Sequence, residues 1–212
     1  MSRGATPFPA EGFRKLLEAE ALREGVPFRE PTLAALGRYL AELDAWRQRI
    51  NLTGDLAPED LAVHAFESAA GAPLIPEGTR VLDIGSGGGL PGIPLAIVRP
   101  DLTVTALEPR RKRAAFLRHV LRSVPVANAE VLEDRVERLD RSSWAVATVR
   151  AVGSLGELVG RAPFLAAGGR LLAWTTDAEA LSRELAPHLV FDRSLPLPRS
   201  ERRTVAVFRR AD

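Results

Sequence analysis

The sequence contains no cysteine and only three histidines, His64, His119 and His188. The lack of cysteine excludes a disulfide framework and a cysteine-ligated metal. The histidines are not spaced as metal ligands, so no metal site is expected. No run of apolar residues approaches the roughly 20 that a membrane-spanning helix requires, and the N-terminal segment lacks the apolar core of a signal peptide. A cytoplasmic protein is therefore expected.

Lysine is also scarce, since only Lys15 and Lys112 occur and arginine carries nearly all of the positive charge. Residues 1–79 hold 8 basic and 12 acidic residues, a net of −4, and residues 80–212 hold 21 and 15, a net of +6, which together give the overall +2. The planar guanidinium suits phosphate and base recognition. The asymmetry suggests that the second part faces a polyanion, although codon bias also produces an excess of arginine.

The length of 212 residues and the 46% apolar content fit one domain with a small extension. Residues 1–79 are predicted to be a helical extension packed on the core, because apolar residues recur there at helical spacing. A first helix ends before residues 25–31, a longer helix is capped by Thr32, and a third runs over about 58–70.

Residues 80–212 alternate between strand and helix patterns, which predicts an α/β domain with a mostly parallel sheet and helices on both faces. The short connection before the last strand favours an antiparallel hairpin there. The expected strands are 80–84, 102–107, 129–132, 144–149, 169–174, 188–192 and 203–208. The expected helices are 92–98, 110–122, 154–162 and 177–185. Ligands of such sheets bind at the carboxyl ends of the strands.

The stretch RVLDIGSGGGLPG, residues 80–92, is the central motif of the chain. It indicates a strand, a glycine turn and the start of a helix. Glycines let the backbone approach a ligand closely. The glycines Gly85, Gly87 and Gly89 follow Asp83 in a G-x-G-x-G pattern that resembles motif I of the Rossmann-like S-adenosylmethionine-dependent methyltransferases. A dinucleotide fingerprint would require a third glycine at Leu90, although a tight turn without a ligand also produces such strings.

Glu108 ends the next predicted strand, about 20 residues beyond the glycine turn. A carboxylate in this place accepts hydrogen bonds from the two hydroxyls of a ribose. This holds for NAD as well as for S-adenosylmethionine, so Glu108 supports an adenosine ligand without choosing between them. A solvated carboxylate at a strand end is the alternative.

Several separated stretches together resemble one family. They are Asn51-Leu52-Thr53, His64 with Ser68, Asp83 to Pro100, Leu107 to Leu117, Arg135-Val136-Glu137 and Arg150-Ala151-Val152. In this order they look like the bacterial small-subunit (16S) ribosomal RNA guanine-N7 methyltransferase family, also called glucose-inhibited division protein B. The resemblance covers about residues 40–208. It implies a class I methyltransferase fold of seven strands with one reversed, S-adenosylmethionine as cofactor, and 16S ribosomal RNA or the small ribosomal subunit as partner.

The resemblance also assigns residues to the cofactor site. Gly85 and Leu90 would line it, Val136 and Glu137 would lie beside the adenine, and Arg150 would border the cofactor and position the reactants. Leu90 could instead simply hold the turn, Glu137 could be a surface acid paired with Arg141, and Arg150 could cap a strand end.

Two basic clusters are candidates for binding the RNA backbone. One is Arg110, Arg111, Lys112 and Arg113, at the start of a predicted helix without acids. The other is Arg199, Arg202 and Arg203, near Arg209 and Arg210. A solvated helix face is the alternative for the first cluster. The family commonly has Lys-Gly just after the fifth strand, where this chain has Trp174-Thr175-Thr176-Asp177. If that lysine contacts an RNA phosphate, its role must pass to an arginine or be lost.

The target atom determines the expected chemistry. Guanine N7 has an in-plane lone pair and no proton, so no general base and no catalytic acid–base pair are expected. The exposed base would be held by a stacking aromatic, for which Trp174 and Phe66 are candidates, although both are also typical core residues. Two other classes stay open: a non-catalytic RNA-binding protein that retains the fold, and an NAD-dependent oxidoreductase. A monomer is expected.

Overall fold

The computed structural model describes residues 6–139, 143–151, 153, 155–161 and 164–210. The helices in this part are α1 (Ala10–Arg23), α2 (Glu30–Arg47), α3 (Pro58–Ala70), α4 (Gly92–Val98), α5 (Arg111–Ser123), α6 (Leu155–Arg161) and α7 (Ala178–Leu185), with short 3-10 turns η1 (Ala72–Leu74) and η2 (Val136–Arg138). The strands are β1 (Arg80–Ile84), β2 (Thr103–Leu107), β3 (Ala129–Leu132), β4 (Trp144–Arg150), β5 (Leu165–Thr175), β6 (Leu189–Pro196) and β7 (Thr204–Arg210). None of the helices in the described ranges is long and apolar enough to cross a bilayer.

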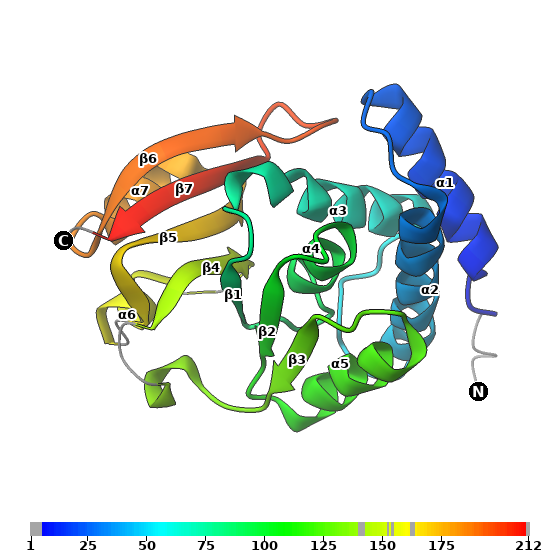
Figure 1. Ribbon diagram of the computed structural model, residues 1–212, viewed down its shortest axis with the longest axis horizontal. Coiled ribbons are helices and arrows are strands. Elements are labelled where there is room, and N and C mark those ends of the chain that lie inside the picture. The colour runs from blue at the N-terminus through cyan, green and yellow to red at the C-terminus, as the bar shows by residue number, and fades with distance from the viewer. Residues whose placement is uncertain (1–5, 140–142, 152, 154, 162–163, 211–212) are drawn as a thin grey trace.

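The seven strands form one sheet in the order β3-β2-β1-β4-β5-β7-β6 (Figure 1). Neighbouring strands from β3 to β5 are parallel, and β7 runs antiparallel to both β5 and β6. Ile84 lies opposite Leu107 and Val149, and Val149 lies opposite Ala173, so β1, β2, β4 and β5 end at one common edge. The predicted sheet, with its reversed final strand, is confirmed.

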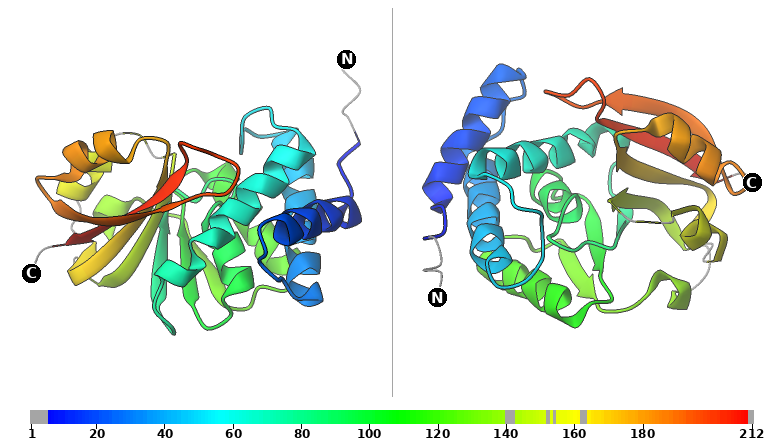
Figure 2. Two further views of the ribbon diagram at one scale, coloured as in Figure 1. Left: turned by 90° about the horizontal axis from the view of Figure 1, so that it is seen from above. Right: turned by 180° about the vertical axis from the view of Figure 1, so that it is seen from behind.

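Each face of the sheet buries its own apolar core. On one face, Val81, Val104 and Val146 pack with apolar residues of α4, α5 and the N-terminal helices. On the other, Leu82 and Ala147 pack with η2, α6 and α7. Figures 1 and 2 show the sheet between these two groups of helices. This alternation follows from the period of two in a strand, which sends successive side chains to opposite faces.

The N-terminal helices share the first of these cores. Phe13, Leu36 and Leu61 are fully buried and belong to the same apolar cluster as Ile93 of α4. The predicted packing of residues 1–79 on the sheet domain is therefore present, and Figure 2 shows α1–α3 gathered at one end of the molecule. The division into an extension (1–79) and a methyltransferase domain (80–212) stays a prediction, because a shared core marks no boundary.

Some predicted boundaries are wrong. Thr32 does not cap α2, because the helix begins at Glu30 and Pro31 occupies its first turn, where proline is favoured. β5 begins at Leu165 and β6 extends to Pro196, since pairing to neighbouring strands prolongs both beyond their apolar runs. The ends of the helix predicted over 154–162, and Val152 and Arg141, lie outside the described residues.

Candidate functional site

The glycine turn after β1 lies at the common edge of the sheet. Gly85, Gly87 and Gly89 have φ angles of +67°, +53° and +92°, a region that L-residues other than glycine rarely adopt. The backbone N–H groups of Gly85 and Ser86 both donate to the carbonyl of Leu107, at 2.9 and 3.1 Å. The sequence predicted a turn that requires glycine, and the backbone conformation gives the physical reason.

Asp83, in β1 just before the turn, supports it through hydrogen bonds to β4 and to the start of α4. Its side chain is fully buried, and its Oδ1 accepts from Thr148 Oγ1 at 2.8 Å while Oδ2 accepts from the Gly92 N–H at 3.3 Å. Burial is the main cause that raises the pKa of Asp83 to about 6. A Cβ at Gly92 would lie 2.6 Å from Oδ2, so this glycine is required by the carboxylate. Asp83 therefore joins β1 to β4 and to the start of α4.

Glu108 holds the turn from the side of β2. It is 2% exposed, and its Oε2 accepts from the Gly87 N–H at 3.0 Å while Oε1 accepts from the Arg110 N–H at 2.8 Å. Each carboxylate oxygen has a further lone pair. The carboxylate that was predicted to bind a ribose therefore also fixes the turn.

The N-terminal helices cover the other side of the turn, which sequence reasoning missed. Tyr39 of α2, the only tyrosine of the chain, is fully buried and donates from Oη to the carbonyl of Gly88 at 2.8 Å. A Cβ at Gly88 would lie 3.2 Å from Leu43 Cδ1. Nε of Arg113 donates to the carbonyl of Asn51 at 3.1 Å, which fastens the loop after α2 beside the turn. The sequence offered one indication of this contact: Tyr39 is a single hydroxyl-bearing side chain among the apolar residues of a predicted helix.

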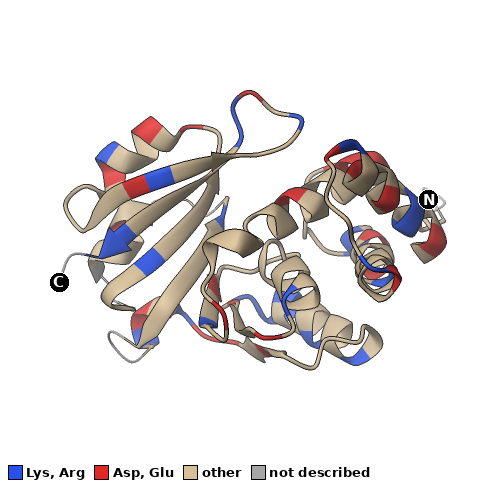
Figure 3. Cartoon of the chain, turned by 45° about the horizontal axis from the view of Figure 1, so that its top comes forward, with Lys and Arg blue, Asp and Glu red and all other residues tan. Residues whose placement is uncertain are grey.

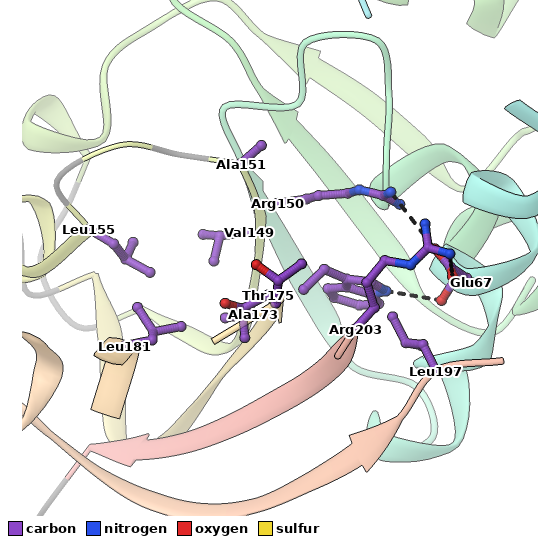
Figure 4. A pocket seen from close by; sticks show the side chains of 12 residues that line it. Glu67, Val149, Arg150, Ala151, Leu155, Ala173, Thr175, Leu181, Leu197 and Arg203 are labelled. Carbon is purple, nitrogen blue, oxygen red and sulfur yellow. Dashed lines mark hydrogen bonds and ion pairs between the residues drawn. The ribbon is translucent and has the colours of Figure 1, made fainter. Parts of the chain in front are cut away.

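A cavity of about 330 Å³ opens beyond the carboxyl ends of β4 and β5 (Figure 4). One side is aliphatic, with Val149, Leu155 and Leu181, and the other is charged, with Glu67 and Arg150 among its residues. The volume lies near the lower end of the range for small-molecule sites, roughly 300–1,000 Å³. The cavity is therefore of a size for one small planar group.

The backbone at the mouth of this cavity is strained. Ala151, which lines it, has a φ of +54°, and a non-glycine residue in this region costs about 1–3 kcal/mol. Such strain is concentrated at ligand sites. The positive φ of Ala151 is therefore held by the surrounding structure and not by the intrinsic preference of alanine.

The charged side of the cavity is an ionic cluster between the end of β4, the loop before β7, and α3. Arg150 donates from Nη1 to the His64 carbonyl at 3.2 Å and to Ser68 Oγ at 3.3 Å. Arg203 Nη2 lies 3.1 Å from Glu67 Oε1, and Arg150 Nη2 lies 3.9 Å from Glu67 Oε2. Figure 4 shows both guanidinium groups turned toward Glu67.

Burial and charge set the protonation of this cluster. Burial, with the two arginines, lowers the pKa of His64 to about 4, so the ring is neutral near pH 7 and Nε2 can accept from Arg203 Nη1 at 3.4 Å. Burial also lowers the pKa of Arg150 and raises the pKa of Glu67. His64, Ser68 and Arg150 were linked by the resemblance, and the structure brings all three together.

The two aromatic candidates occupy different places. Trp174 borders the cavity, and its Nε1–H donates to the carbonyl of Glu67 at 2.9 Å. A Cβ at Gly71 would lie 2.4 Å from its ring, so the ring is packed tightly. Phe66 packs edge to face on Phe28, 5.7 Å between ring centroids, and does not line this cavity. Only Trp174 is placed to contact a group in the cavity.

The remaining cofactor candidates lie around the turn. Leu90 is half-buried and packs against the first core. Val136 is buried in the second core, whereas Glu137, next to it in η2, is exposed. Their place, after β3, is at the same edge of the sheet as the turn.

Most of the first basic cluster faces solvent, since Arg110, Arg111 and Lys112 are exposed at the start of α5. Arg113 is half-buried and fastened to Asn51. The arginine-rich helix therefore offers three exposed cations at the carboxyl edge of the sheet.

The second basic cluster is divided. Arg199 Nη1 pairs with Glu20 of α1 at 2.8 Å, and Arg203 points to Glu67, whereas Arg202 is exposed. Figure 3 shows that the loop between β6 and β7, which carries these residues, bears both signs of charge. Arg209, in the adjoining strand, pairs with Asp192 at 3.1 Å. The acids that divide the cluster are far away in the sequence, so the run of arginines did not reveal them.

The family model described as rRNA small subunit methyltransferase G, or GidB, matches residues 32–188. The ribosomal RNA small subunit methyltransferase G of Sorangium cellulosum is 40% identical over 173 residues, which cover 77% of this chain and 71% of that protein. The protein of the same name from Leptothrix cholodnii is 34% identical over 209 residues, 91% of this chain and 94% of that protein. The match to the protein of that name from Chromobacterium violaceum, at 42% identity, spans 63% of its length.

Two solved structures show the same fold at low identity. A SAM-dependent O-methyltransferase from Thermotoga maritima has a TM-score of 0.53 and 16% identity, over 81% of this chain and 71% of that one. A tRNA (m1A58) methyltransferase from Aquifex aeolicus has a TM-score of 0.54 and 15% identity, over 76% and 71%. They confirm the predicted class I methyltransferase fold. With its glycine turn, its strand order and the matches to family members, the chain belongs to the rRNA small subunit methyltransferase G family.

Proposed function

We propose that this protein transfers a methyl group from S-adenosylmethionine to N7 of a guanine in 16S ribosomal RNA. The observation that supports this most directly is the cavity at the ends of β4 and β5, beside the glycine turn, in a chain of this family. The turn and the cavity share one edge of the sheet. Methyl donor and acceptor base would therefore meet there.

The residues of the turn fit the cofactor. A Cβ at Gly87 would lie at ordinary contact distance from the Gly85 carbonyl oxygen, 3.6 Å, and from Arg113 Nη1, 3.7 Å, so the protein itself does not require a glycine there for lack of space. We assign Gly85, Gly87, Gly89 and Leu90 to the wall of the site. Asp83 shapes the turn, and Glu108 would accept from the ribose hydroxyls with lone pairs that its backbone donors leave unused.

Three further residues complete the proposed cofactor site. Val136 and Glu137 would flank the adenine, because η2 follows β3 at the ligand edge of the sheet. Arg150 would stand between the cofactor and the base, since it ends β4 and lines the cavity. Its hydrogen bonds to α3 hold the guanidinium in place, which gives Arg150 a positioning role.

The chemistry requires orientation rather than proton transfer. S-adenosylmethionine supplies a sulfonium methyl group, and the N7 lone pair forms the new N–C bond as the C–S bond pair returns to sulfur. The protein must hold the base in line and exclude water, which contributes up to about 7–11 kcal/mol. Because N7 carries no proton, the reaction needs no general base.

The RNA backbone would be bound by Arg110, Arg111 and Lys112, whose exposed charges lie at the same edge, and by Arg202 in the loop after β6. Arg113, Arg199 and Arg203 have partners within the protein, and their contact with the phosphates of the RNA backbone would require a rearrangement of these pairs. Either free 16S ribosomal RNA or the small ribosomal subunit would be the substrate. We propose that the protein acts as a monomer in the cytoplasm, where ribosomes work.

The test is transfer of a labelled methyl group to 16S ribosomal RNA and to small subunits from a strain that lacks the corresponding gene. After digestion to nucleosides, mass spectrometry should find the label in 7-methylguanosine alone, and the modified position is then mapped. Label in another nucleoside would refute the N7 assignment. Binding of RNA without any transfer would identify a non-catalytic binder, and displacement of S-adenosylmethionine by NAD would favour the oxidoreductase alternative.

A further inference from the structure

Glu67 is a buried acid without adequate partners. Its side chain is 1% exposed, and neither carboxylate oxygen accepts a hydrogen bond from the residues that the structure describes. Arg203 lies 3.1 Å away but outside hydrogen-bonding geometry, and Arg150 lies 3.9 Å away. A buried ion pair offsets its desolvation only if the remaining lone pairs are satisfied. The carboxylate therefore lacks donors, and it lines the cavity.

The surroundings of Glu67 define which donors would fit. The carboxylate presents two acceptor oxygens, the guanidinium of Arg203 beside it presents donors, and the Trp174 ring forms a wall fixed by its bond to the Glu67 carbonyl. Guanine is the nucleobase that offers the complement on one edge, because N1–H and the N2 amino group are donors and O6 next to them is an acceptor. Adenine offers an acceptor at N1 instead.

We propose that Glu67 is the residue that selects guanine: its carboxylate accepts hydrogen bonds from N1–H and the N2 amino group of the target base, while Arg203 donates to O6. This inference rests on the proposed function, because it places the target base in the cavity. A base held by this edge keeps N7 free, whereas an arginine that binds O6 and N7 together would block the reacting atom.

The same contact stabilises the transition state. As the N–C bond forms, positive charge passes from sulfur to the purine, and N1–H becomes more acidic. Its hydrogen bond to a carboxylate then strengthens. Interactions that strengthen in the transition state raise kcat rather than only lowering KM. Loss of Glu67 is therefore expected to lower kcat as well as to raise KM.

The first experiment compares Glu67→Gln with Glu67→Asp and with Asp44→Asn. Gln would turn its amide N–H toward donors, so its kcat/KM should fall by about 10–100-fold, the equivalent of a lost bidentate contact to a base. Asp keeps both acceptors and should lose less than Gln. Asp44, a buried acid paired with Arg47 of α2, lies outside the cavity, and its variant should keep wild-type activity. Binding of S-adenosylmethionine by calorimetry should be unchanged in all three.

The second experiment tests the contact itself. Once the methylated guanine is mapped, the RNA is ligated with inosine at that position, which removes only the N2 amino group. Wild-type protein should lose roughly tenfold in kcat/KM, as expected for one lost charge-assisted hydrogen bond of about 1.5 kcal/mol, and Glu67→Gln should lose little more. An undiminished inosine penalty in Glu67→Gln, with S-adenosylmethionine binding intact, would overturn the assignment of Glu67. Wild-type protein that methylates no RNA at all would instead refute the proposed function, so the two failures are distinct.

Discussion

Alanine substitutions at Gly87 and Gly89 should separate ligand binding from folding within one turn. Both glycines have positive φ, and alanine there costs about 1–2 kcal/mol of stability from backbone strain. The directions of the two added Cβ atoms differ. At Gly87 the nearest atom is 3.6 Å away, whereas at Gly89 the Cβ would lie 2.7 Å from Ile93 Cγ1 and 3.3 Å from Tyr39 Oη.

The packing term therefore falls on Gly89 alone. Ile93 is fully buried, and overpacking in a core costs about 1–3 kcal/mol. The sum for Gly89→Ala is about 2–5 kcal/mol, against about 1–2 kcal/mol for Gly87→Ala. In a protein of this length each kcal/mol lowers Tm by about 2–4 °C, so the two variants should be clearly separated in thermal unfolding.

The dissociation constant for S-adenosylmethionine should report directly on Gly87→Ala, whereas Gly89→Ala acts mainly through packing. The methyl group of Gly87→Ala meets the protein only at ordinary contact distances, so in the proposed site it would act on the cofactor and should raise Kd about tenfold or more, which equals about 1.4 kcal/mol. The assays are thermal or urea unfolding without ligand, and calorimetric titration with S-adenosylmethionine below the Tm of each variant. If Gly89→Ala were no less stable than Gly87→Ala, the packing argument would fail. If Gly87→Ala bound the cofactor as wild type does, the cofactor would not lie against this turn.

Three further predictions concern residues that support the site. Folding raises the pKa of Asp83 from 3.8 to about 6, so the stability that this group contributes is full below pH 3.8 and is lost as the pH rises through 6. Urea unfolding of the wild type should show a loss of about 3 kcal/mol over this window, which Asp83→Asn should lack. The titration of His64 occurs in both proteins and cancels in the difference. Tyr39→Phe leaves the buried Gly88 carbonyl without its donor and should cost about 1–3 kcal/mol in urea unfolding and weaken S-adenosylmethionine binding. Arg111→Glu should weaken RNA binding and make the slope of log affinity against log salt concentration shallower by about one. Arg122→Glu, at the far end of α5, should change neither.

Each of these predictions has an outcome that contradicts it. An Asp83→Asn protein with the pH slope of wild type would mean that another group causes the slope. An unchanged urea midpoint for Tyr39→Phe would mean that Gly88 finds another donor. Equal RNA affinities of the Arg111 and Arg122 variants at moderate salt would exclude the start of α5 as the RNA surface. Arg113 is unsuitable for this comparison, because its bond to Asn51 also supports the turn.

The sequence by itself determined the family, the order of the strands and helices, and the glycine turn. These depend on local patterns: the apolar run from Val81 to Ile84, the helical pattern predicted over residues 110–122, and the closely spaced glycines that follow the run. The family match and the class I fold confirm this part of the interpretation. The assignment of individual site residues stays a prediction, since no ligand contact tests it.

Only the tertiary structure decided which charges meet. Arg203 and Glu67 are far apart in the chain yet 3.1 Å apart in space, Arg199 is paired with Glu20, and Tyr39 reaches Gly88. No periodicity predicts such pairs, because they depend on how the loop between β6 and β7 and the helices α1, α2 and α3 pack at the sheet. Arginines that form one basic cluster in the sequence are therefore divided between an ion pair with α1 and the cavity, and Glu67, in the middle of a helical pattern, lines that cavity.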